Sequence, residues 1–216
     1  MKANLATAEY AGIRAPGWRL VLASASPRRA ELLTRLRLPF DVAPSDVEES
    51  HIADCAPDIL AETLAKLKAQ SAAGAWPGRP VLAADTVVAL DGQALGKPVD
   101  IADAVSMLER LSGREHDVFT GVALVWRGDL FSAVGATRVR FRGLTRQEIE
   151  AYVATDAPLD KAGAYGIQDG GSPVESYEGS YSNVVGLPVA LMADLLLQAG
   201  LIGGPVRATI ASEDAR

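Results

Sequence analysis

The segment Val81–Leu90 constrains the fold more than any other part of the chain. It reads Val-Leu-Ala-Ala-Asp-Thr-Val-Val-Ala-Leu, and a strongly apolar run of this length, followed by the turn signal Asp91-Gly92, indicates a buried strand. Asp85 and Thr86 interrupt it. Because simple burial of an aspartate is unfavourable, we expect a strand end at which Asp85 faces a cleft and binds metal or activates water. The alternative is an Asp85 carboxylate satisfied by backbone donors.

Strands and helices alternate along the rest of the chain. Short strands are predicted at 19–23 and 40–43, helices at 56–73, 102–111, 145–154 and 188–198, and a hairpin of two long strands at 117–126 and 130–141. Thr145 and Glu148 form a capping box. The stretch 163–183 is rich in Gly, Ser and Tyr, which is typical of a loop that forms a site. The order of elements predicts an α/β fold with a mixed sheet.

The charge balance excludes some classes of partner. The formal net charge is −6, so the chain lacks the basic surface of a general nucleic-acid-binding protein. An acidic protein can still bind a polyanion through locally clustered cations or a metal ion. The segment 184–202 is the most apolar, but Pro188, Asp194 and Gln198 interrupt it, and we expect no membrane span. Cys55 is the one cysteine, which is compatible with a reducing compartment, and we expect a cytoplasmic protein.

We expect one catalytic domain over residues 19–202. Residues 1–18 are interpreted as a flexible N-terminal extension, since they lack the basic and apolar regions of a targeting signal. Residues 203–216 are small and polar and are interpreted as a flexible C-terminal tail. No internal repeat and no linker is evident, although two lobes could share one sheet with a cleft between them.

The turn Ser24–Arg29 has the composition of a phosphate site. Ser26 is a good N-cap and Pro27 is favoured at the first helical position, and the free N–H groups of a helix N-terminus attract phosphate. Ser24 and Ser26 can add hydroxyl donors. Arg28 and Arg29 stand in the first helical turn, where they oppose the helix dipole, which indicates an anion at this place. The alternative is a capped surface helix with two solvated arginines.

Other polar residues carry weaker signals when each is taken alone. Glu48 and Glu49 could bind a metal or lie in a solvated loop, and Lys68 and Lys97 could bind phosphate or stand at the surface. Gln168, in a glycine-rich segment, could hydrogen-bond a base edge or a phosphate.

Several other classes of site are not indicated. His116 is expected at the surface and without a role, and no His-Cys cluster has the spacing of a zinc site. The Walker A pattern, and a Gly-x-Gly-x-x-Gly after a strand, are both absent.

Taken in order, these segments resemble the Maf family of nucleoside triphosphate pyrophosphatases. The resemblance runs from about Leu20 to Leu197 and is carried by residues 22–29 (LASASPRR), 48–49 (EE), 64–69 (LAKLKA), 84–88 (ADTVV), 96–98 (GKP), 111–114 (LSGR), 161–168 (KAGAYGIQ) and 178–188 (EGSYSNVVGLP). The common family pattern has Gly where this chain has Ala25. Each motif alone is weak, but their order along the chain is specific.

The resemblance implies an elongated α/β protein in which helices flank a mixed sheet and two lobes surround a central cleft, as in ITPase-like folds. It implies that Asp85 is the general base and that Glu49 and Asp85 hold a divalent cation, Mg, Mn or Co. Residues implied to bind the triphosphate are Ser24, Arg28, Arg29, Lys68 and Lys97. Arg28, Thr86 and Gln168 match the positions that select the base and are similar to the branch acting on dTTP and UTP. A homodimer with a housecleaning role in nucleotide pools is also implied.

Three rival functions stay open. The first is the 7-methyl-GTP branch of the same family, which departs from this pattern at the base-selecting positions. The second is a nucleotide-sensing inhibitor of cell division, which would not need Asp85 or Glu49, and both are present. The third is a nucleic-acid-binding protein, which the acidic balance disfavours.

Overall fold

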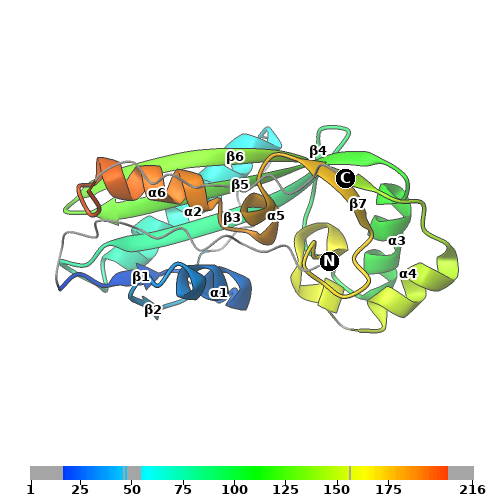
Figure 1. Ribbon diagram of the computed structural model, residues 1–216, viewed down its shortest axis with the longest axis horizontal. Coiled ribbons are helices and arrows are strands. Elements are labelled where there is room, and N and C mark those ends of the chain that lie inside the picture. Colours follow the sequence, from blue (N-terminus) through cyan, green and yellow to red (C-terminus); the bar gives the residue numbers. More distant parts are fainter. Residues whose placement is uncertain (1–16, 46, 48–54, 156, 204–216) are drawn as a thin grey trace, which may run out of the picture.

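The computed structural model describes residues 17–45, 47, 55–155 and 157–203, and Figure 1 shows an elongated molecule. Its strands are β1 (Leu20–Leu22), β2 (Phe40–Val42), β3 (Val81–Leu90), β4 (Gln93–Leu95), β5 (Glu115–Trp126), β6 (Asp129–Phe141) and β7 (Val174–Glu178). Its α-helices are α1 (Pro27–Arg35), α2 (Pro57–Ala73), α3 (Ile101–Leu111), α4 (Arg146–Val153), α5 (Tyr181–Val185) and α6 (Val189–Gln198). Two short 3-10 turns are η2 (Ala157–Asp160) and η3 (Ala162–Ala164).

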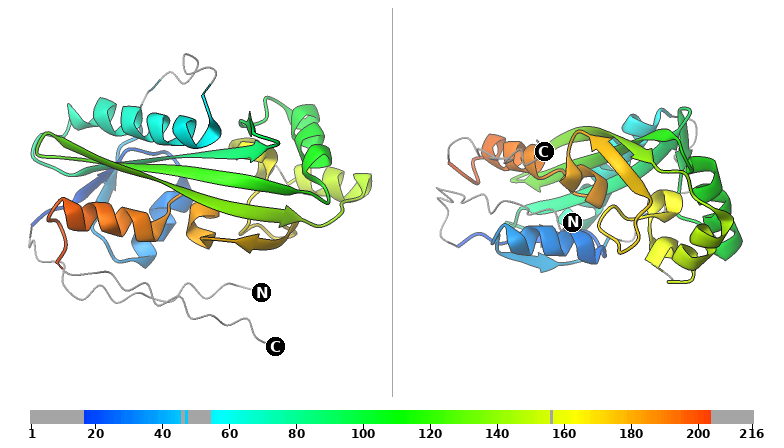
Figure 2. Two further views of the ribbon diagram at one scale, coloured as in Figure 1. Left: turned by 90° about the horizontal axis from the view of Figure 1, so that it is seen from above. Right: turned by 45° about the vertical axis from the view of Figure 1, so that its right-hand side comes forward.

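The strands of the described ranges form one mixed sheet in the order β2-β1-β3-β5-β6-β7, and β4 also pairs with β3. Strand β1 is parallel to β2 and β3, whereas β3, β5, β6 and β7 pair antiparallel in sequence. Helices cover both faces, with α2 on one face and α6 on the other (Figure 2). The prediction of an α/β fold with a mixed sheet flanked by helices is therefore confirmed.

One edge of β3 is only partly paired. Its other edge pairs with β5 from Val81 to Ala89. On the partly paired edge, β1 pairs with Val81 and Leu82, and β4 pairs with residues from Val88 to Leu90. Residues 83–87 therefore have no strand partner there within the part of the chain that is described. A strand edge without a neighbouring strand is accessible to other groups, and this gap opens the sheet at Asp85.

Two large apolar cores lie at opposite ends of the sheet. The first core packs α1 and α6 against the sheet and contains Leu33, Leu82 and Met192. The second packs α3 and α4 against the other end and contains Leu108 and Phe141. Strands β3, β5 and β6 contribute to both cores, so two lobes share one sheet. Leu82 and Ala84 of β3 enter the first core and Val88 and Leu90 enter the second, so the open stretch 83–87 lies at the junction of the two cores.

The strand that carries Asp85 differs from the prediction. Asp85 was expected at a strand end, and this is wrong: β3 is a continuous strand of 10 residues with Asp85 near its middle. Asp85 is paired in register with Gly121 of β5. The ladder with β5 keeps the strand intact, and the missing neighbour on the other edge opens it to the cleft.

The stretch 163–183 is more ordered than a loop. It includes the edge strand β7 and the short helix α5. Strand β7 reads Val-Glu-Ser-Tyr-Glu and four of its five residues are exposed, so it shows no alternation of buried and polar residues. Its extended shape depends on pairing with β6, which the local sequence does not reveal.

The helix boundaries follow the expected signals. Helix α1 begins at Pro27 after Ser26, and Thr145 with Glu148 forms the capping box of α4. Gly200, with a φ of +68°, follows α6 and adopts the left-handed conformation that suits glycine after a helix. Among the described helices, none combines the length and hydropathy needed to cross a membrane.

Candidate active site

A cavity of about 540 Å³ opens at the gap along β3, a volume typical of small-molecule sites. Eight of the residues singled out in the sequence line it, namely Ser24, Arg28, Arg29, Lys68, Asp85, Thr86, Lys97 and Gln168. The Ser24–Arg29 turn and the aspartate of β3 thus face a common cleft. Glu49 lies outside the described residues. The roles of these residues stay predictions.

The N-terminus of α1 forms one wall. Ser26 is the N-cap residue, but its side chain accepts no capping hydrogen bond, and the first turn contains no acidic residue. The backbone N–H of Ser26 instead donates to Ser24 Oγ at 3.2 Å. The first N–H groups of this nine-residue helix are left without a side-chain cap, and such groups are suited to bind an anion.

The two arginines of this turn point to different partners. Arg29 donates to Ser24 Oγ at 2.8 Å, to the carbonyl of Gly186 at 2.7 Å and to Thr86 Oγ1 at 3.3 Å. It therefore ties α1 to β3 and to the residue that follows α5. Arg28 instead donates from Nη1 to Asp160 Oδ2 at 2.8 Å, and this ion pair links α1 with η2. We infer that Arg29 holds together the segments that form this wall of the cavity, whereas Asp160 holds Arg28 at the edge of the wall.

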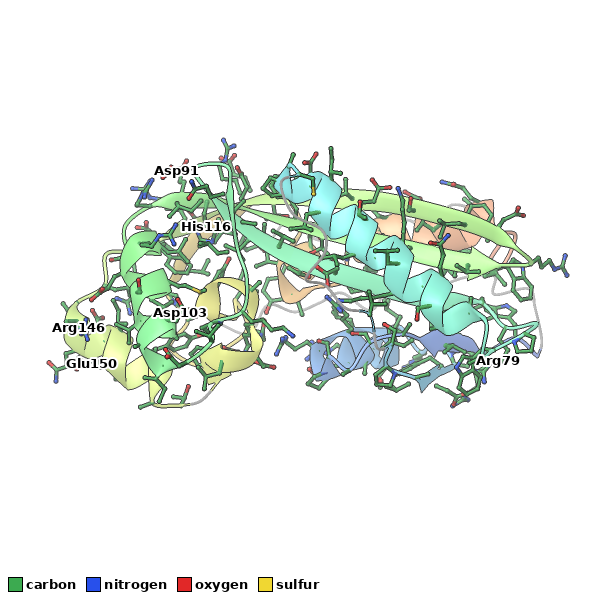
Figure 3. All side chains as sticks on the ribbon, turned by 180° about the vertical axis from the view of Figure 1, so that it is seen from behind. Arg79, Asp91, Asp103, His116, Arg146 and Glu150 are labelled. Carbon is green, nitrogen blue, oxygen red and sulfur yellow. The ribbon has the colours of Figure 1, made fainter. Side chains whose placement is uncertain are left out.

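Alternation along β3 sends Asp85 and Thr86 to opposite faces of the sheet. Asp85 shares its face with Val81 and Ala83, which pack in the cluster under α2. Helix α2 crosses that face of the sheet (Figure 3). It places Lys68 Nζ 2.5 Å from Asp85 Oδ1, with side chains 14% and 12% exposed. A nearly buried carboxylate is therefore paired with a cation at the cavity wall.

Thr86 lies on the other face and belongs to a buried hydrogen-bond network. Its hydroxyl is 3.1 Å from that of Thr120, and Thr120 donates to the carbonyl of Asn183 at 2.8 Å. The Asn183 amide in turn donates to Val118 O and Thr137 Oγ1. Because Arg29 also donates to Thr86, the network connects the arginine to the sheet and α5.

The opposite wall comes from the second lobe and includes two residues that were not singled out in the sequence. Lys161 is 8% exposed and lies 3.1 Å from Asp160 Oδ1. Burial opposes ionisation of Asp160, but hydrogen bonds from Arg28 and Lys161 outweigh it and lower its pKa. The start of the segment 161–168, which contains a lysine before two glycines, was the available signal for Lys161.

The cavity is locally positive although the chain is acidic overall. Its charged lining residues in the described ranges are Arg28, Arg29, Lys68, Lys97, Lys161, Asp85 and Asp160. Five cations thus face two carboxylates, and the chain as a whole has a formal net charge of −6. Clustered cations at the walls of a cleft attract an anionic ligand. This is one of the two ways in which an acidic protein was expected to bind a polyanion.

The donor set fits a divalent cation that is shared with a substrate. In the part of the chain that is described, no group of three His, Cys, Asp or Glu side chains converges. Asp85 and Asp160 are the carboxylates among the described lining residues, and each is paired with a cation, Asp85 with Lys68 and Asp160 with Arg28. Mg²⁺ is commonly held by one or two carboxylates together with substrate phosphates. Asp85 therefore suits that kind of site and would hold the cation together with a phosphate ligand.

His116 was expected at the surface, and this is wrong. It is 3% exposed and lies in the lobe of α3 and α4 (Figure 3). Its Nε2 is 2.8 Å from the hydroxyl of Tyr165, and its ring meets Phe141 edge-on at 4.9 Å. Burial lowers the His116 pKa to about 4 and raises the pKa of Tyr165. The pair is therefore neutral, and it supports the Tyr165 side of the cavity from behind.

Comparison with known proteins decides the family. The family described as Maf-like protein matches residues 19–199. The chain belongs to the Maf family. This Maf protein is 49% identical over 182 residues to the dTTP/UTP pyrophosphatase of Symbiobacterium thermophilum, covering 84% of the chain and 94% of that relative. It is 52% identical over 181 residues to the enzyme of the same name from Moorella thermoacetica, with 82% and 93% covered.

Solved structures give a more distant likeness. The Ham1 protein of Staphylococcus aureus aligns with this Maf protein at a TM-score of 0.42 and 18% identity, over 57% of the chain and 71% of that structure. That likeness adds nothing to the family assignment, which the sequence relatives and the family match carry by themselves.

Proposed function

We propose that this Maf protein hydrolyses dTTP and UTP to the nucleoside monophosphate and pyrophosphate. The observation that carries the proposal is the cavity at the gap in β3. Its walls combine an uncapped helix N-terminus, several cations and the Lys68–Asp85 pair. A chain of phosphates and one reacting water would need these groups within one site. The relatives named dTTP/UTP pyrophosphatase supply the substrate class.

In the proposed reaction, water attacks the α-phosphorus and pyrophosphate leaves. Asp85 accepts the proton of the attacking water, and its partner Lys68 lies beside the reacting phosphate. Arg28, Lys97 and the N–H groups of α1 bind the leaving phosphates and offset the negative charge that grows on them. Ser24 is positioned by Arg29 and contributes a hydroxyl to the same wall.

A divalent cation is part of the proposal. Asp85 would hold it together with phosphate oxygens, and Glu49, which lies outside the described residues, is proposed as its second carboxylate. When bound, the cation would supply positive charge and Lewis-acid polarisation at the phosphate. Mg, Mn and Co are the candidates.

The base is proposed to bind near Thr86 and Gln168 with Arg28 at the rim. All three line the cavity, and Gln168 has the hydrogen-bonding groups to recognise a pyrimidine edge. We further propose a cytoplasmic homodimer that removes unwanted nucleotides from the pool. Sedimentation of the purified protein tests its assembly state.

The decisive experiment measures pyrophosphate release by the purified protein from dTTP, UTP, 7-methyl-GTP, ATP and GTP, each with Mg and with Mn. We expect the largest kcat/KM with dTTP and UTP and loss of activity with a chelator. A preference for 7-methyl-GTP would assign the protein to the other branch, and binding without turnover would favour a nucleotide sensor.

A further inference from the structure

The residue next to Gln168 controls how its amide is turned. Gln168 Nε2 donates to Asp169 Oδ1 at 2.9 Å. The Asp169 side chain is 15% exposed, whereas Gln168 is exposed and lines the cavity. A carboxylate only accepts hydrogen bonds, so it must face the NH₂ end of the amide. The orientation of the Gln168 amide therefore follows from the chemistry of its neighbour.

The other oxygen of Asp169 is held from behind. Tyr152 donates its hydroxyl hydrogen to Asp169 Oδ2 at 2.8 Å, and it accepts a hydrogen bond from the backbone N–H of Gly166 at 3.0 Å. Lys161 Nζ is 3.4 Å from the same oxygen. Because the Gly166 N–H occupies the acceptor side of the Tyr152 hydroxyl, its hydrogen points to Asp169. Tyr152 and Lys161 both donate toward this atom, so the atom at this position must be an oxygen that accepts hydrogen bonds.

Gly166 leaves room for the pair. A Cβ added there would overlap Gln168 Nε2 and would lie 2.6 Å from Asp169 Oδ1. Real side-chain atoms are not found so close, so a larger residue at position 166 would displace the ends of the Gln168 and Asp169 side chains from their present contact. A glycine thus accommodates the contact, and the half-buried Tyr152 together with Lys161 holds the Asp169 side chain.

The carbonyl end of the Gln168 amide is left for a ligand. In the described ranges, no protein donor bonds to Gln168 Oε1. An oxygen so placed accepts a hydrogen bond from a ligand N–H. Uracil and thymine carry a hydrogen on ring nitrogen N3, whereas the N3 of cytosine is itself an acceptor. Two acceptors that face each other are unfavourable, because each loses its hydrogen bond to water.

We propose that Asp169 is a positioning residue that sets base selectivity. It turns the Gln168 carbonyl toward the base, and this selects uracil and thymine nucleotides against cytosine nucleotides. The inference rests on the proposed function, and it adds a residue outside the resemblance motif, which ends at Gln168. Tyr152 and Lys161 act through Asp169 by holding its second oxygen.

The substitution Asp169→Asn tests the direction of the amide. Tyr152 and Lys161 still require an oxygen on their side, so the new NH₂ group would face Gln168. The Gln168 amide would then turn by half a rotation, accept from Asn through Oε1, and present its NH₂ to the base. We expect kcat/KM for UTP relative to CTP to fall by about tenfold or more, the size of one hydrogen bond exchanged for a mismatch.

Two further variants separate positioning from folding. Asp169→Ala removes the acceptor that orients the Gln168 amide but does not favour the opposite orientation. The ratio of kcat/KM for UTP to kcat/KM for CTP should therefore lie between the ratios of the wild type and Asp169→Asn. Asp129→Asn makes the same chemical change at an exposed position at the start of β6, outside the cavity lining. It should leave kcat/KM for UTP and CTP, and therefore their ratio, within about twofold of the wild type.

The outcomes distinguish this inference from the proposed function. Suppose that the wild type releases pyrophosphate from UTP, and that the ratio of kcat/KM for UTP to kcat/KM for CTP is the same in Asp169→Asn and Asp169→Ala as in the wild type. Only the role of Asp169 is then overturned. Equal use of UTP and CTP by the wild type would overturn it as well. Failure of both variants to fold, checked by circular dichroism and Tm, would make the carboxylate a structural requirement and count against the inference. No turnover of any triphosphate would instead reject the proposed function.

Discussion

At the scale of single residues, Asp85 and Thr86 show how two neighbouring positions serve different tasks. Alternation along β3 directs Asp85 toward Lys68 of α2 and Thr86 toward Arg29 and Thr120. The pair lies where β3 lacks a neighbouring strand on one edge. The chemistry of the site therefore depends on a two-residue polar interruption in an apolar strand, on an edge where the described strands leave residues 83–87 unpaired.

The first prediction concerns the carboxylate of Asp85. The variant Asp85→Asn keeps the shape of the side chain but cannot accept the proton of the attacking water. We expect kcat to fall by about 10²- to 10⁴-fold, the usual contribution of a general base, with a smaller change in KM. Asp129→Asn, the same change at the exposed first residue of β6, is the control and should retain activity. Near-native turnover of Asp85→Asn with metal present would contradict the assignment.

The second prediction contrasts the two arginines of α1. Arg29 donates to three acceptors on separate segments, before α1, in β3 and after α5, so Arg29→Ala should lower the free energy of unfolding by about 1–3 kcal/mol. Arg28 pairs with an Asp160 side chain that is 56% exposed, so Arg28→Ala should lower it by less than about 1 kcal/mol. Urea unfolding of both variants measures the difference. Equal losses of stability would mean that Arg29 does not organise the wall.

The third prediction concerns His116 and pH. Burial lowers its pKa from 6.5 to about 4 in the folded state, so the unfolded chain binds more protons between these values. Stability should therefore be complete above about pH 6.5 and decline as the pH falls toward 4, by roughly 3 kcal/mol at most. In His116→Gln, which can bond Tyr165 without titrating, this part of the pH dependence should vanish. Unfolding curves from pH 4.5 to 7.5 compare the two proteins.

At the scale of elements, the contact between α2 and the sheet places Lys68. The buried face of α2 is made of Ala61, Leu64, Ala65 and Ala69, and it lies against Gly121 of β5, where an added Cβ would come within 2.6 Å of the Glu62 Cα. Small residues on both sides let the helix lie close to the strands. The sequence predicted the helix correctly, but two of its large apolar residues, Ile59 and Leu67, are 55% and 38% exposed.

The fourth prediction tests this close contact. Gly121→Ala would place a methyl group against the backbone of α2 at Ala61, and helix and strand would have to separate. We expect a loss of at least about 1–3 kcal/mol in the free energy of unfolding, together with lower activity, because Lys68 would shift from Asp85. Gly74→Ala at the end of the same helix has nothing within 4 Å of its added Cβ and should be close to neutral. Equal stability of the two variants would rule out a tight contact.

At the scale of the whole molecule, two cores are joined by the same three strands. Leu33 is fully buried in the core of α1 and α6, and Leu108 is fully buried in the core of α3 and α4. The cavity takes its walls from both lobes. A ligand in the cavity would contact elements that belong to different cores. The two lobes must therefore keep a fixed position relative to each other, and the shared strands β3, β5 and β6 provide this.

The fifth prediction is cooperative unfolding. Leu33→Ala and Leu108→Ala each empty part of one core, and each should lower stability by about 2–5 kcal/mol. Because the cores share strands, we expect one transition in both variants, with the same midpoint when followed by near-UV and far-UV circular dichroism. Two separate transitions in either variant would show that the lobes unfold independently.

What the sequence determined is mainly local. The apolar run of β3, the serine before α1 with the proline that begins it, and the capping box of α4 depend on residues within a few positions of one another, and these were predicted correctly, apart from the strand end expected at Asp85. The same holds for the β5–β6 hairpin, which turns at Arg127 and Gly128 with positive φ at both. The ordered motifs also indicated which polar residues share a site.

Only the tertiary structure decided how those residues meet. The gap along β3 exists because β1 and β4 are short and pair with its two ends, a long-range arrangement that no local pattern records. The strand β7 forms because β6 lies beside it. His116 is buried because Phe141 and Tyr165 pack around it. Local propensities act over a few residues, whereas pairing and burial depend on partners far away in the chain, and that is the physical reason for the division.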